Sequence, residues 1–438
     1  MSQSNQPQVS ANSPQETNSP SRRSFLQQSA VASAVALPLA MRSVHAGADD
    51  TIKVGLIGCG GRGMGAASNA LAADPGARLT AIADMFEDRL ELAEKALSRQ
   101  LGDRFQIADR KFFGFDAYQK VIDSGVDVVL LTSPPHFRPQ HLEAAIKAGK
   151  HIFCEKPIAC DPAGVRKVLE LSKHAEEKKL NLVSGLCWRY DLGVKATIEK
   201  LLDGAIGDIV AIQENYLTGT LWQRARRDSW TDMHYQIYNW LYFRWLSGDH
   251  INEQFIHSLD KSLWLHRDEP PARCYGMGGR QCRTAAEFGD VYDHFYVVYE
   301  WADGTKTFAA TRQMEGCFNE TEDYVIGTKG TAKVLAHEIQ GANPWKYKYE
   351  GPGNQPNMYD LEHVALFKAI RDGKPINNGK YMSYSTMMAI MGREACYSGQ
   401  AITWDQAMNS KMDLTPPAYE FGPAPDVKVL QPGSYKFA

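Results

Sequence analysis

The stretch from Asp249 to Asp260 carries acidic and histidine side chains at helical spacing. Asp249, Glu253 and His257 are four residues apart, and Asp260 lies three residues after His257. On one continuous helix, this spacing predicts a single stripe of functional groups. The stripe could transfer a proton or form a salt-bridged surface. His250, Glu253 and His257 could also bind a divalent metal, although the H-E-x-x-H order is absent.

Lys156 is a second candidate for proton transfer. It lies in Glu155-Lys156-Pro157, directly after the apolar run 151–154. If that run is a strand of a parallel sheet, Lys156 follows its carboxyl end, where such sheets bind ligands. There the lysine could bridge or relay the proton of a reacting hydroxyl. The alternative is a surface lysine that pairs with Glu155.

A glycine-rich turn predicts a dinucleotide site. Residues 51–58 form a β-rich run, and the turn Gly58-Cys59-Gly60-Gly61-Arg62-Gly63 matches G-x-G-x-x-G. Gly58 allows a tight turn, Gly60 lets the backbone approach a pyrophosphate, and Gly63 lets the next helix pack on the strand. Free N–H groups at the start of that helix would bind the phosphates.

Asp84 adds a nucleotide preference to this turn. It ends the predicted strand 77–83, and a carboxylate about 20 residues after the glycines accepts hydrogen bonds from a ribose 2′-hydroxyl. The same carboxylate would repel a 2′-phosphate. The sequence therefore favours NAD over NADP. The nearby Arg89 leaves NADP as the alternative cofactor.

Strand and helix patterns alternate as far as the predicted strand 180–185. Val126 to Leu131 is an uninterrupted apolar run, typical of a buried parallel strand. We therefore expect a doubly wound α/β Rossmann domain with ligands at the carboxyl ends of its strands. The cofactor-site candidates at these ends are Gly58, Gly60, Arg62, Gly63, Asp84, Ser133, Pro134, His136, Glu155 and Lys156.

The glycine turn and the phrase from Ala148 to Pro157 together resemble the Gfo/Idh/MocA family of glucose–fructose oxidoreductase and inositol dehydrogenase. The resemblance implies a Rossmann domain followed by an α+β domain, whose large, open, mostly antiparallel β-sheet binds substrate and often forms the oligomer contact. It places Lys156 near the nicotinamide and the reacting hydroxyl. It makes His257 the general base, with Glu253 where the family usually has aspartate.

The crossover 187–190 should lead into this second domain. Arg189 resembles an arginine often found there in the family, which could contact substrate oxygens or tie the domains together. Arg138 is a departure, because many relatives have histidine at its position. Strand-like runs between 208 and 335 predict the second sheet, and helical stretches at 359–372 and 381–398 should pack back on the body. The substrate-site candidates are Arg189, Tyr190, Glu253, His257 and Asp260.

The first 46 residues have the features of a twin-arginine export signal. A polar stretch precedes Arg22 and Arg23, and a weakly apolar run follows, which is too short to span a bilayer. Val44-His45-Ala46 then suits a signal peptidase. We therefore expect a signal peptide at 1–46, a dinucleotide-binding domain at 47–187 and a substrate domain at 188–438. The exported protein should be periplasmic and free of the membrane.

Composition excludes several other classes. Hydrophobic residues make up 44% and charged residues 23% of the 438, as in soluble globular proteins. The net charge of −3 provides no basic field for nucleic acid. Eight cysteines are too few for a disulfide scaffold, and whether Cys274 and Cys282 pair stays open.

An aromatic stretch from Trp230 to Trp245 has two interpretations. It could form a buried helix, because aromatic side chains bury large areas in any core, or a platform on which sugars stack. Arg224, Arg226 and Arg227 lie just before it and suggest a solvated loop or a contact with an acidic sugar.

These features predict an exported NAD(P)-dependent oxidoreductase. It would oxidise or reduce a secondary hydroxyl or keto group of a sugar, glycoside or polyol, with Lys156 and His257 handling the proton. Free cofactor is scarce outside the cytoplasm, so we expect tightly bound NAD. The alternative is an NAD-dependent glycosidase that works by transient oxidation and elimination, and a third hypothesis is a non-catalytic NAD-binding protein. We expect a homo-oligomer, no nucleic-acid partner and no metal.

Overall fold

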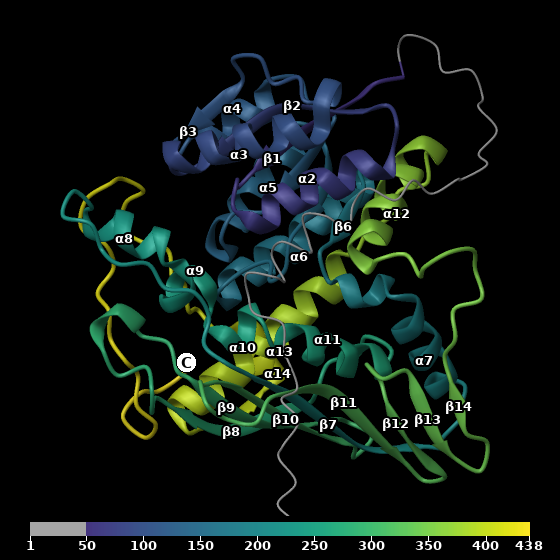
Figure 1. Ribbon diagram of the computed structural model, residues 1–438. Coiled ribbons are helices and arrows are strands. Elements are labelled where there is room, and N and C mark those ends of the chain that lie inside the picture. Colours follow the sequence, from purple (N-terminus) through teal and green to yellow (C-terminus); the bar gives the residue numbers. More distant parts are fainter. Residues whose placement is uncertain (1–49) are drawn as a thin grey trace, which may run out of the picture. The chain divides into compact units, whose positions relative to one another are not determined.

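The computed structural model of the protein describes residues 50–438. The chain divides into two units, residues 1–50 and 51–438, and the export signal predicted at 1–46 lies outside the described residues. The second unit contains two β-sheets with helices packed on them (Figure 1). Among residues 50–438, no helix combines the length and the apolar character needed to cross a membrane.

The first sheet confirms the predicted doubly wound fold. Within residues 50–438 it has six parallel strands in the order β3-β2-β1-β4-β5-β6. The order reverses on either side of β1, so the turn that follows β1 lies at the switch point where such sheets bind ligands. The strands are β1 (Ile52–Ile57), β2 (Ala77–Asp84), β3 (Lys111–Phe113), β4 (Val128–Leu131), β5 (His151–Cys154) and β6 (Leu182–Ser184).

Helices connect these strands and cover both faces of the sheet. At the start of α6, Asp161 accepts a hydrogen bond from the Gly164 N–H at 2.7 Å and Pro162 occupies the first turn, as the sequence predicts. Buried strand residues such as Val129 pack against the helices. The connecting helices are α2 (Gly61–Ala73), α3 (Glu87–Leu101), α4 (Ala117–Asp123), α5 (Arg138–Lys147) and α6 (Pro162–Glu177).

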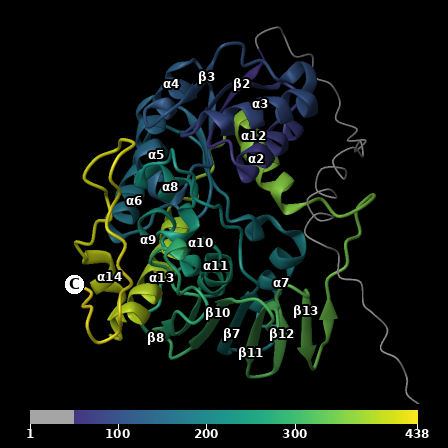
Figure 2. The same ribbon diagram turned by 60° about the vertical axis from the view of Figure 1, so that its left-hand side comes forward.

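A helix from the other end of the chain completes this layer. α12 (Met358–Asp372) packs against α2, and the two lie side by side in both views (Figures 1 and 2). Its Arg371 donates to the Asp74 carboxylate at 2.8 Å. The predicted return of the 359–372 helix to the body of the protein is therefore confirmed.

The second sheet is mixed and mostly antiparallel. In the described part of the chain its nine strands lie in the order β14-β13-β12-β11-β7-β10-β9-β8-β15. β10 runs parallel to β7 and antiparallel to β9. The strands are β7 (Ile209–Thr218), β8 (Arg273–Gly279), β9 (His294–Glu300), β10 (Lys306–Gln313), β11 (Glu320–Gly327), β12 (Gly330–Lys333), β13 (Glu338–Gly341), β14 (Trp345–Lys346) and β15 (Ile402–Thr403).

Helices on one face of this sheet join it to the first. α13 (Gly379–Ser398) contacts α6 of the Rossmann layer as well as β8 and β9, and α11 (Ile256–Leu265) contacts both α13 and β7. The alternation on β9 follows from this one-sided cover, because Phe295 and Val297 are buried beneath helices whereas Tyr296 is exposed.

The predicted single helix over 249–260 is wrong. Asp249 has φ of 69° and caps a four-residue helix, α10 (His250–Glu253), and two residues separate α10 from α11. The Asp249 carboxylate is fully buried and accepts hydrogen bonds from the Tyr292 N–H and the Tyr397 hydroxyl. Asp249 therefore anchors the start of α10 to the sheet and to α13, and it shares no stripe with Glu253 and His257.

Arg189 holds the crossover between the two sheets. Its guanidinium contacts the Asp260 carboxylate at 2.9 Å and the Asp268 carboxylate at 2.6 Å, and it lies 3.9 Å from the centre of the Tyr381 ring. Asp260 is buried and also accepts a hydrogen bond from Ser385 at 2.7 Å. Arg189 and Asp260 thus form a tie between elements, and their contact with a substrate stays a prediction.

Replacing Arg189 with methionine should lower the free energy of unfolding by about 3–5 kcal/mol, because the buried Asp260 carboxylate loses its partner. Urea unfolding followed by circular dichroism measures the change. The control Lys195→Met removes an exposed contact with Glu199 and should cost less than about 1 kcal/mol. Equal stability of the two variants would show that Arg189 does not hold the crossover.

Candidate active site

The glycine turn forms an open cradle at the end of β1. Gly58 has φ of 102°, and a Cβ there would lie 2.5 Å from the Ser133 backbone nitrogen. A Cβ on Gly63 would lie 1.9 Å from the Gly58 carbonyl oxygen, so α2 starts this close to the turn only with glycine. A Cβ on Gly60 would meet no neighbouring atom within 4 Å. The open space beside Gly60 fits the close approach of a pyrophosphate.

Asp84 lies at the edge of this cradle. Its carboxylate accepts hydrogen bonds from the Cys59 N–H at 2.6 Å and from the Phe86 N–H at 3.1 Å. Burial raises the pKa of Asp84, and these N–H groups oppose the shift. A carboxylate in contact with the phosphate-binding turn is placed as the ribose-binding acid of a Rossmann fold requires.

The loop after β4 is braced by Arg138, which sequence reasoning gave no role. The buried guanidinium donates to the Ser133 carbonyl at 2.9 Å and also to the Pro157 carbonyl, so it links the loops that follow β4 and β5. Ser133 is buried, and its hydroxyl contacts the His141 ring at 3.1 Å. Pro134 is half-buried in the same loop.

His136 is held by distant parts of the chain. Its Nε2 contacts the Tyr419 hydroxyl at 2.9 Å, and its ring lies 4.9 Å from that of Trp245. Burial lowers the pKa of His136 to about 4, so the ring is neutral near pH 7. His136 thus links the loop after β4 to the C-terminal part of the chain, and its cofactor role stays a prediction.

Lys156 and Glu253 meet at the centre of the candidate site. The Lys156 ammonium donates to the Glu253 carboxylate at 2.9 Å and also to the Glu253 carbonyl oxygen. α10 ends at Glu253, which leaves that carbonyl available to the lysine. The side chains are 14% and 17% exposed, so the pair is shielded while part of each group still reaches solvent.

His257 lies in the first turn of α11, close to this pair. Its Nδ1 is buried and has no hydrogen-bond partner among residues 50–438. Burial, together with the positive charges of Lys156, Lys261 and Arg62, holds the pKa of His257 well below its usual value. A neutral imidazole with an unused nitrogen is suited to accept a proton.

Glu155 faces Arg62, away from the Lys156 ammonium. Arg62 donates to Glu155 and, at 2.7 Å, to Glu362 of α12. Burial disfavours the Glu155 carboxylate, but the charges of Arg62, Arg138 and Lys156 hold its pKa below the usual value. The alternative of a surface lysine that pairs with Glu155 is therefore not what the structure shows, because the Lys156 ammonium pairs with Glu253.

Two residues at this site carried no signal in the sequence. Glu362 reaches Arg62 across 300 positions of the chain. Tyr216 of β7 is half-buried, and burial together with the nearby charge of Glu253 raises the pKa of its hydroxyl, which stays a hydrogen-bond donor. The packing of α12 on α2 brings Glu362 to the site, and the packing of the second sheet brings Tyr216 there.

Other candidates take structural positions. Tyr190 donates through its hydroxyl to the Asn378 side chain at 3.1 Å. His250 contacts Asp249 at 3.1 Å, and among residues 50–438 no group of three His, Cys, Asp or Glu side chains is placed to hold a metal ion. Cys274 is buried and Cys282 exposed, and the two do not form a disulfide.

The aromatic stretch forms mainly a buried cluster. Trp230, Tyr242 and Trp245 are each less than a tenth exposed. This burial favours the core interpretation over the sugar platform. In the neighbouring basic group, Arg226 forms an ion pair with Asp232 at 2.8 Å, as expected for a solvated loop.

Comparisons with known proteins agree with this arrangement. Residues 52–183 match the Gfo/Idh/MocA model, described as an oxidoreductase family with an NAD-binding Rossmann fold. Inositol 2-dehydrogenase 3 of Saccharopolyspora erythraea is 27% identical over 365 residues, which cover 80% of this chain and 95% of that protein. The 2,7-anhydro-N-acetylneuraminate hydratase of Escherichia coli is 27% identical over 219 residues, 50% of this chain and 54% of that enzyme. The chain thus spans about half the length of this second relative.

Solved structures share the fold. Levoglucosan dehydrogenase, in complex with NADH and levoglucosan, matches with a TM-score of 0.64 at 19% identity, over 81% of this chain and 99% of that one. The aldose-aldose oxidoreductase of Caulobacter crescentus matches with a TM-score of 0.63 at 18% identity over the same shares. At these identities the likeness establishes the architecture alone.

Alanine at Gly63 and alanine at Gly60 should have different effects. Gly63→Ala should lower the free energy of unfolding by about 1–3 kcal/mol, because its Cβ collides with the Gly58 carbonyl. Gly60→Ala should leave thermal unfolding unchanged and weaken NAD⁺ binding in isothermal titration, because the backbone there is extended and the Cβ enters the cradle. Unchanged NAD⁺ affinity in Gly60→Ala would argue against a pyrophosphate at this position.

At pH ~6.5, the usual histidine pKa, the imidazole of His257 should still be neutral. It should take up a proton only when the pH falls well below that value. Removing a positive neighbour in Lys156→Met should raise the pKa of His257. Side-chain NMR titration measures both values, and His257→Gln assigns the resonance. A midpoint at or above ~6.5 in the unmodified protein would contradict the assignment.

Proposed function

We propose that this chain, whose residues 52–183 match the Gfo/Idh/MocA oxidoreductases, transfers a hydride between NAD and a secondary carbinol of a sugar, glycoside or polyol. The convergence of Lys156, Glu253 and His257 carries the proposal. The shielded ammonium of Lys156 lies just after β5, and the neutral base His257 lies close to it. β5 belongs to the same sheet whose switch point carries the glycine cradle. The inositol 2-dehydrogenase among the relatives supports the substrate class.

The chain's own residues provide each requirement of the reaction except the hydride acceptor. NAD⁺, when bound, accepts the hydride that leaves the carbinol carbon. The turn from Gly58 to Gly63 would bind its pyrophosphate, and Asp84 would accept hydrogen bonds from a ribose hydroxyl. Asp84 supports NAD as the preferred cofactor, because its charge repels a 2′-phosphate.

Lys156 and His257 would have different roles at the substrate hydroxyl, one as a hydrogen-bond donor and the other as the proton acceptor. A lysine ammonium has three N–H donors, and Glu253 takes two of them, so one is left for the reacting oxygen. As the C–H bond breaks and the carbonyl forms, the hydroxyl proton passes to the neutral imidazole of His257. Glu253 acts as a positioning residue that holds Lys156 in place.

A second candidate function is suggested by the hydratase among the relatives. The same base and cofactor would support transient oxidation, elimination of an aglycone and addition of water, with the cofactor restored at the end. This route ends in net hydrolysis of a glycoside with no lasting change in the cofactor.

The proposal also covers where the protein acts and how it assembles. The twin-arginine pattern at Arg22 and Arg23 supports an extracytoplasmic location. A homo-oligomer is supported by the outer face of the second sheet, where Met277 lies opposite Tyr296 and both side chains are exposed.

Lys156→Met and His257→Gln should each reduce hydride transfer by about 10²–10⁴-fold, the usual contribution of a positioned proton-transfer group. The measurement is the absorbance of reduced nicotinamide as NAD⁺ and a panel of sugars, polyols and glycosides are added. Lys147→Met, at an exposed ion pair with Glu143, is the matched control. Release of an aglycone with no lasting absorbance would favour the second candidate, and full activity in both variants would overturn the assignment.

A further inference from the structure

Two segments far apart in the sequence lie together beside the carboxyl ends of β2, β3 and β4. The first is the α8 segment, defined as residues 230–245 around α8 (Asp232–Tyr238). The second is the C-terminal strap, residues 413–427, drawn in yellow beside α8 (Figure 1). They are joined by hydrogen bonds from the Met233 N–H to the Gly422 carbonyl and from the Gln236 side chain to the Pro425 carbonyl, both at 3.1 Å.

Both segments enclose the residues that follow Asp84. The ring centre of Phe86 lies 4.5 Å from that of His234, 4.9 Å from that of Tyr238 and 5.9 Å from that of Phe421. Tyr238 also donates through its hydroxyl to Asp88 at 2.8 Å. The end of β2, which carries the proposed ribose-binding carboxylate, is therefore walled by aromatic rings from outside the Rossmann layer.

The strap extends this wall over the neighbouring strand ends. Phe421 lies 5.0 Å from Phe115, which follows β3, and Tyr419 contacts His136, which follows β4. Tyr419 and Phe421 are nevertheless 36% and 43% exposed, whereas Phe86 is 8% exposed. Part of each strap ring is thus free to contact a ligand.

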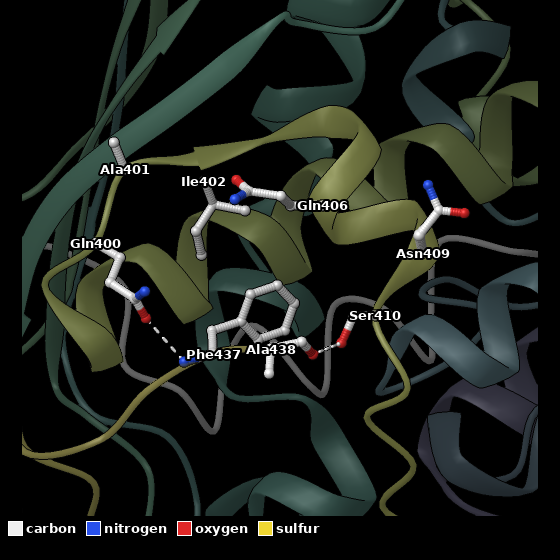
Figure 3. A pocket seen from close by; sticks show the side chains of 8 residues that line it. All are labelled: Gln400, Ala401, Ile402, Gln406, Asn409, Ser410, Phe437 and Ala438. Atoms are coloured by element: carbon white, nitrogen blue, oxygen red, sulfur yellow. Dashed lines mark hydrogen bonds between the residues drawn. The ribbon is translucent and has the colours of Figure 1, made fainter.

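Both ends of the strap are anchored. At its start, the Leu414 N–H donates to the Asp161 carboxylate at 2.8 Å. Beyond its end, Phe437 is buried in a pocket beside Ile402, where its N–H donates to Gln400 at 2.8 Å and the Ala438 carbonyl accepts from Ser410 at 2.6 Å (Figure 3). The strap is therefore a closed loop, and its middle can leave the strand ends only by lifting.

We propose that the α8 segment and the strap form a clamp over the adenosine half of the dinucleotide and retain it between turnovers. The inference rests on the proposed function, because Asp84 at the end of β2 fixes where the adenosine ribose would lie. A purine presents a flat π-face, and aromatic rings stack on such faces regardless of the base. Dissociation would then require loss of the stacking contacts and lifting of a doubly anchored loop, which slows release.

The first test measures how fast bound nucleotide leaves. The full chain is loaded with NADH, and the decay of NADH fluorescence is followed after a chase with excess NAD⁺. Phe421→Ala should speed release about tenfold or more, because one base–aromatic stack contributes roughly 1–3 kcal/mol. The matched control is Phe318→Ala, which removes an exposed aromatic ring (71% exposed) outside the clamp and should release NADH at the unmodified rate.

The second test needs no variant. Limited proteolysis of the unmodified protein, with the cut sites read by mass spectrometry, should show slower cleavage within residues 413–427 when NAD⁺ is present. Equal release from Phe421→Ala and the unmodified protein, or equal cleavage with and without NAD⁺, would overturn the clamp while nucleotide binding itself persists. If the unmodified protein binds no NADH at all, the proposed function fails together with the clamp.

Discussion

The contact between Lys156 and Glu253 fixes the geometry on which the candidate site depends. It joins Lys156, two residues after β5 of the first sheet, to Glu253, the last residue of α10 in the second layer. Because the carboxylate and the carbonyl of Glu253 both accept from the same ammonium, the lysine is held by two acceptors. This arrangement also places a positive charge close to His257, which favours the neutral imidazole.

Further charges, half-buried in Arg62 and buried in Arg138, surround this contact and link the loops of the first sheet. Arg62 links the start of α2 to Glu155 and to α12, and Arg138 links the loops after β4 and β5. Burying such charges is costly unless each finds a partner, so these groups do little to raise stability by themselves. Their effect is to fix the positions of these loops and helices, because each pair joins elements that no local structure would hold together.

Under the proposed function, the clamp and the cradle meet opposite demands, because a cofactor must be able to enter its site and must then be retained there. The opening beside Gly60 lets a dinucleotide approach the backbone, whereas the α8 segment and the strap cover the adenosine end. A cofactor that stays bound must be restored where it is, by a second substrate or by the reverse hydride step of an elimination route. Both candidate functions are compatible with a cofactor that is restored without leaving its site.

The sequence by itself determined the parts of this protein that depend on local backbone chemistry. The glycine turn, the apolar strand 128–131, the Asp161 cap and the α/β order were predictable because their residue types restrict φ and ψ or alternate within a few positions. Lys156, Glu253 and His257 were also recognisable as candidates from their types and spacing. The family resemblance then made His257 the general base and placed Lys156 near the nicotinamide and the reacting hydroxyl.

Tertiary structure alone decided which of these candidates meet. Helical spacing placed Asp249, Glu253 and His257 on one stripe. The Asp249 carboxylate is instead held by Tyr292 and Tyr397, and the two-residue break between α10 and α11 separates Glu253 from the helix that carries His257. Arg189 and Asp260 also pair with each other only because the packing of distant elements brings them together. The partners of Arg62 and His136 lie 300 and 283 positions away. No local pattern encodes contacts at such separations, since they form only when distant layers pack.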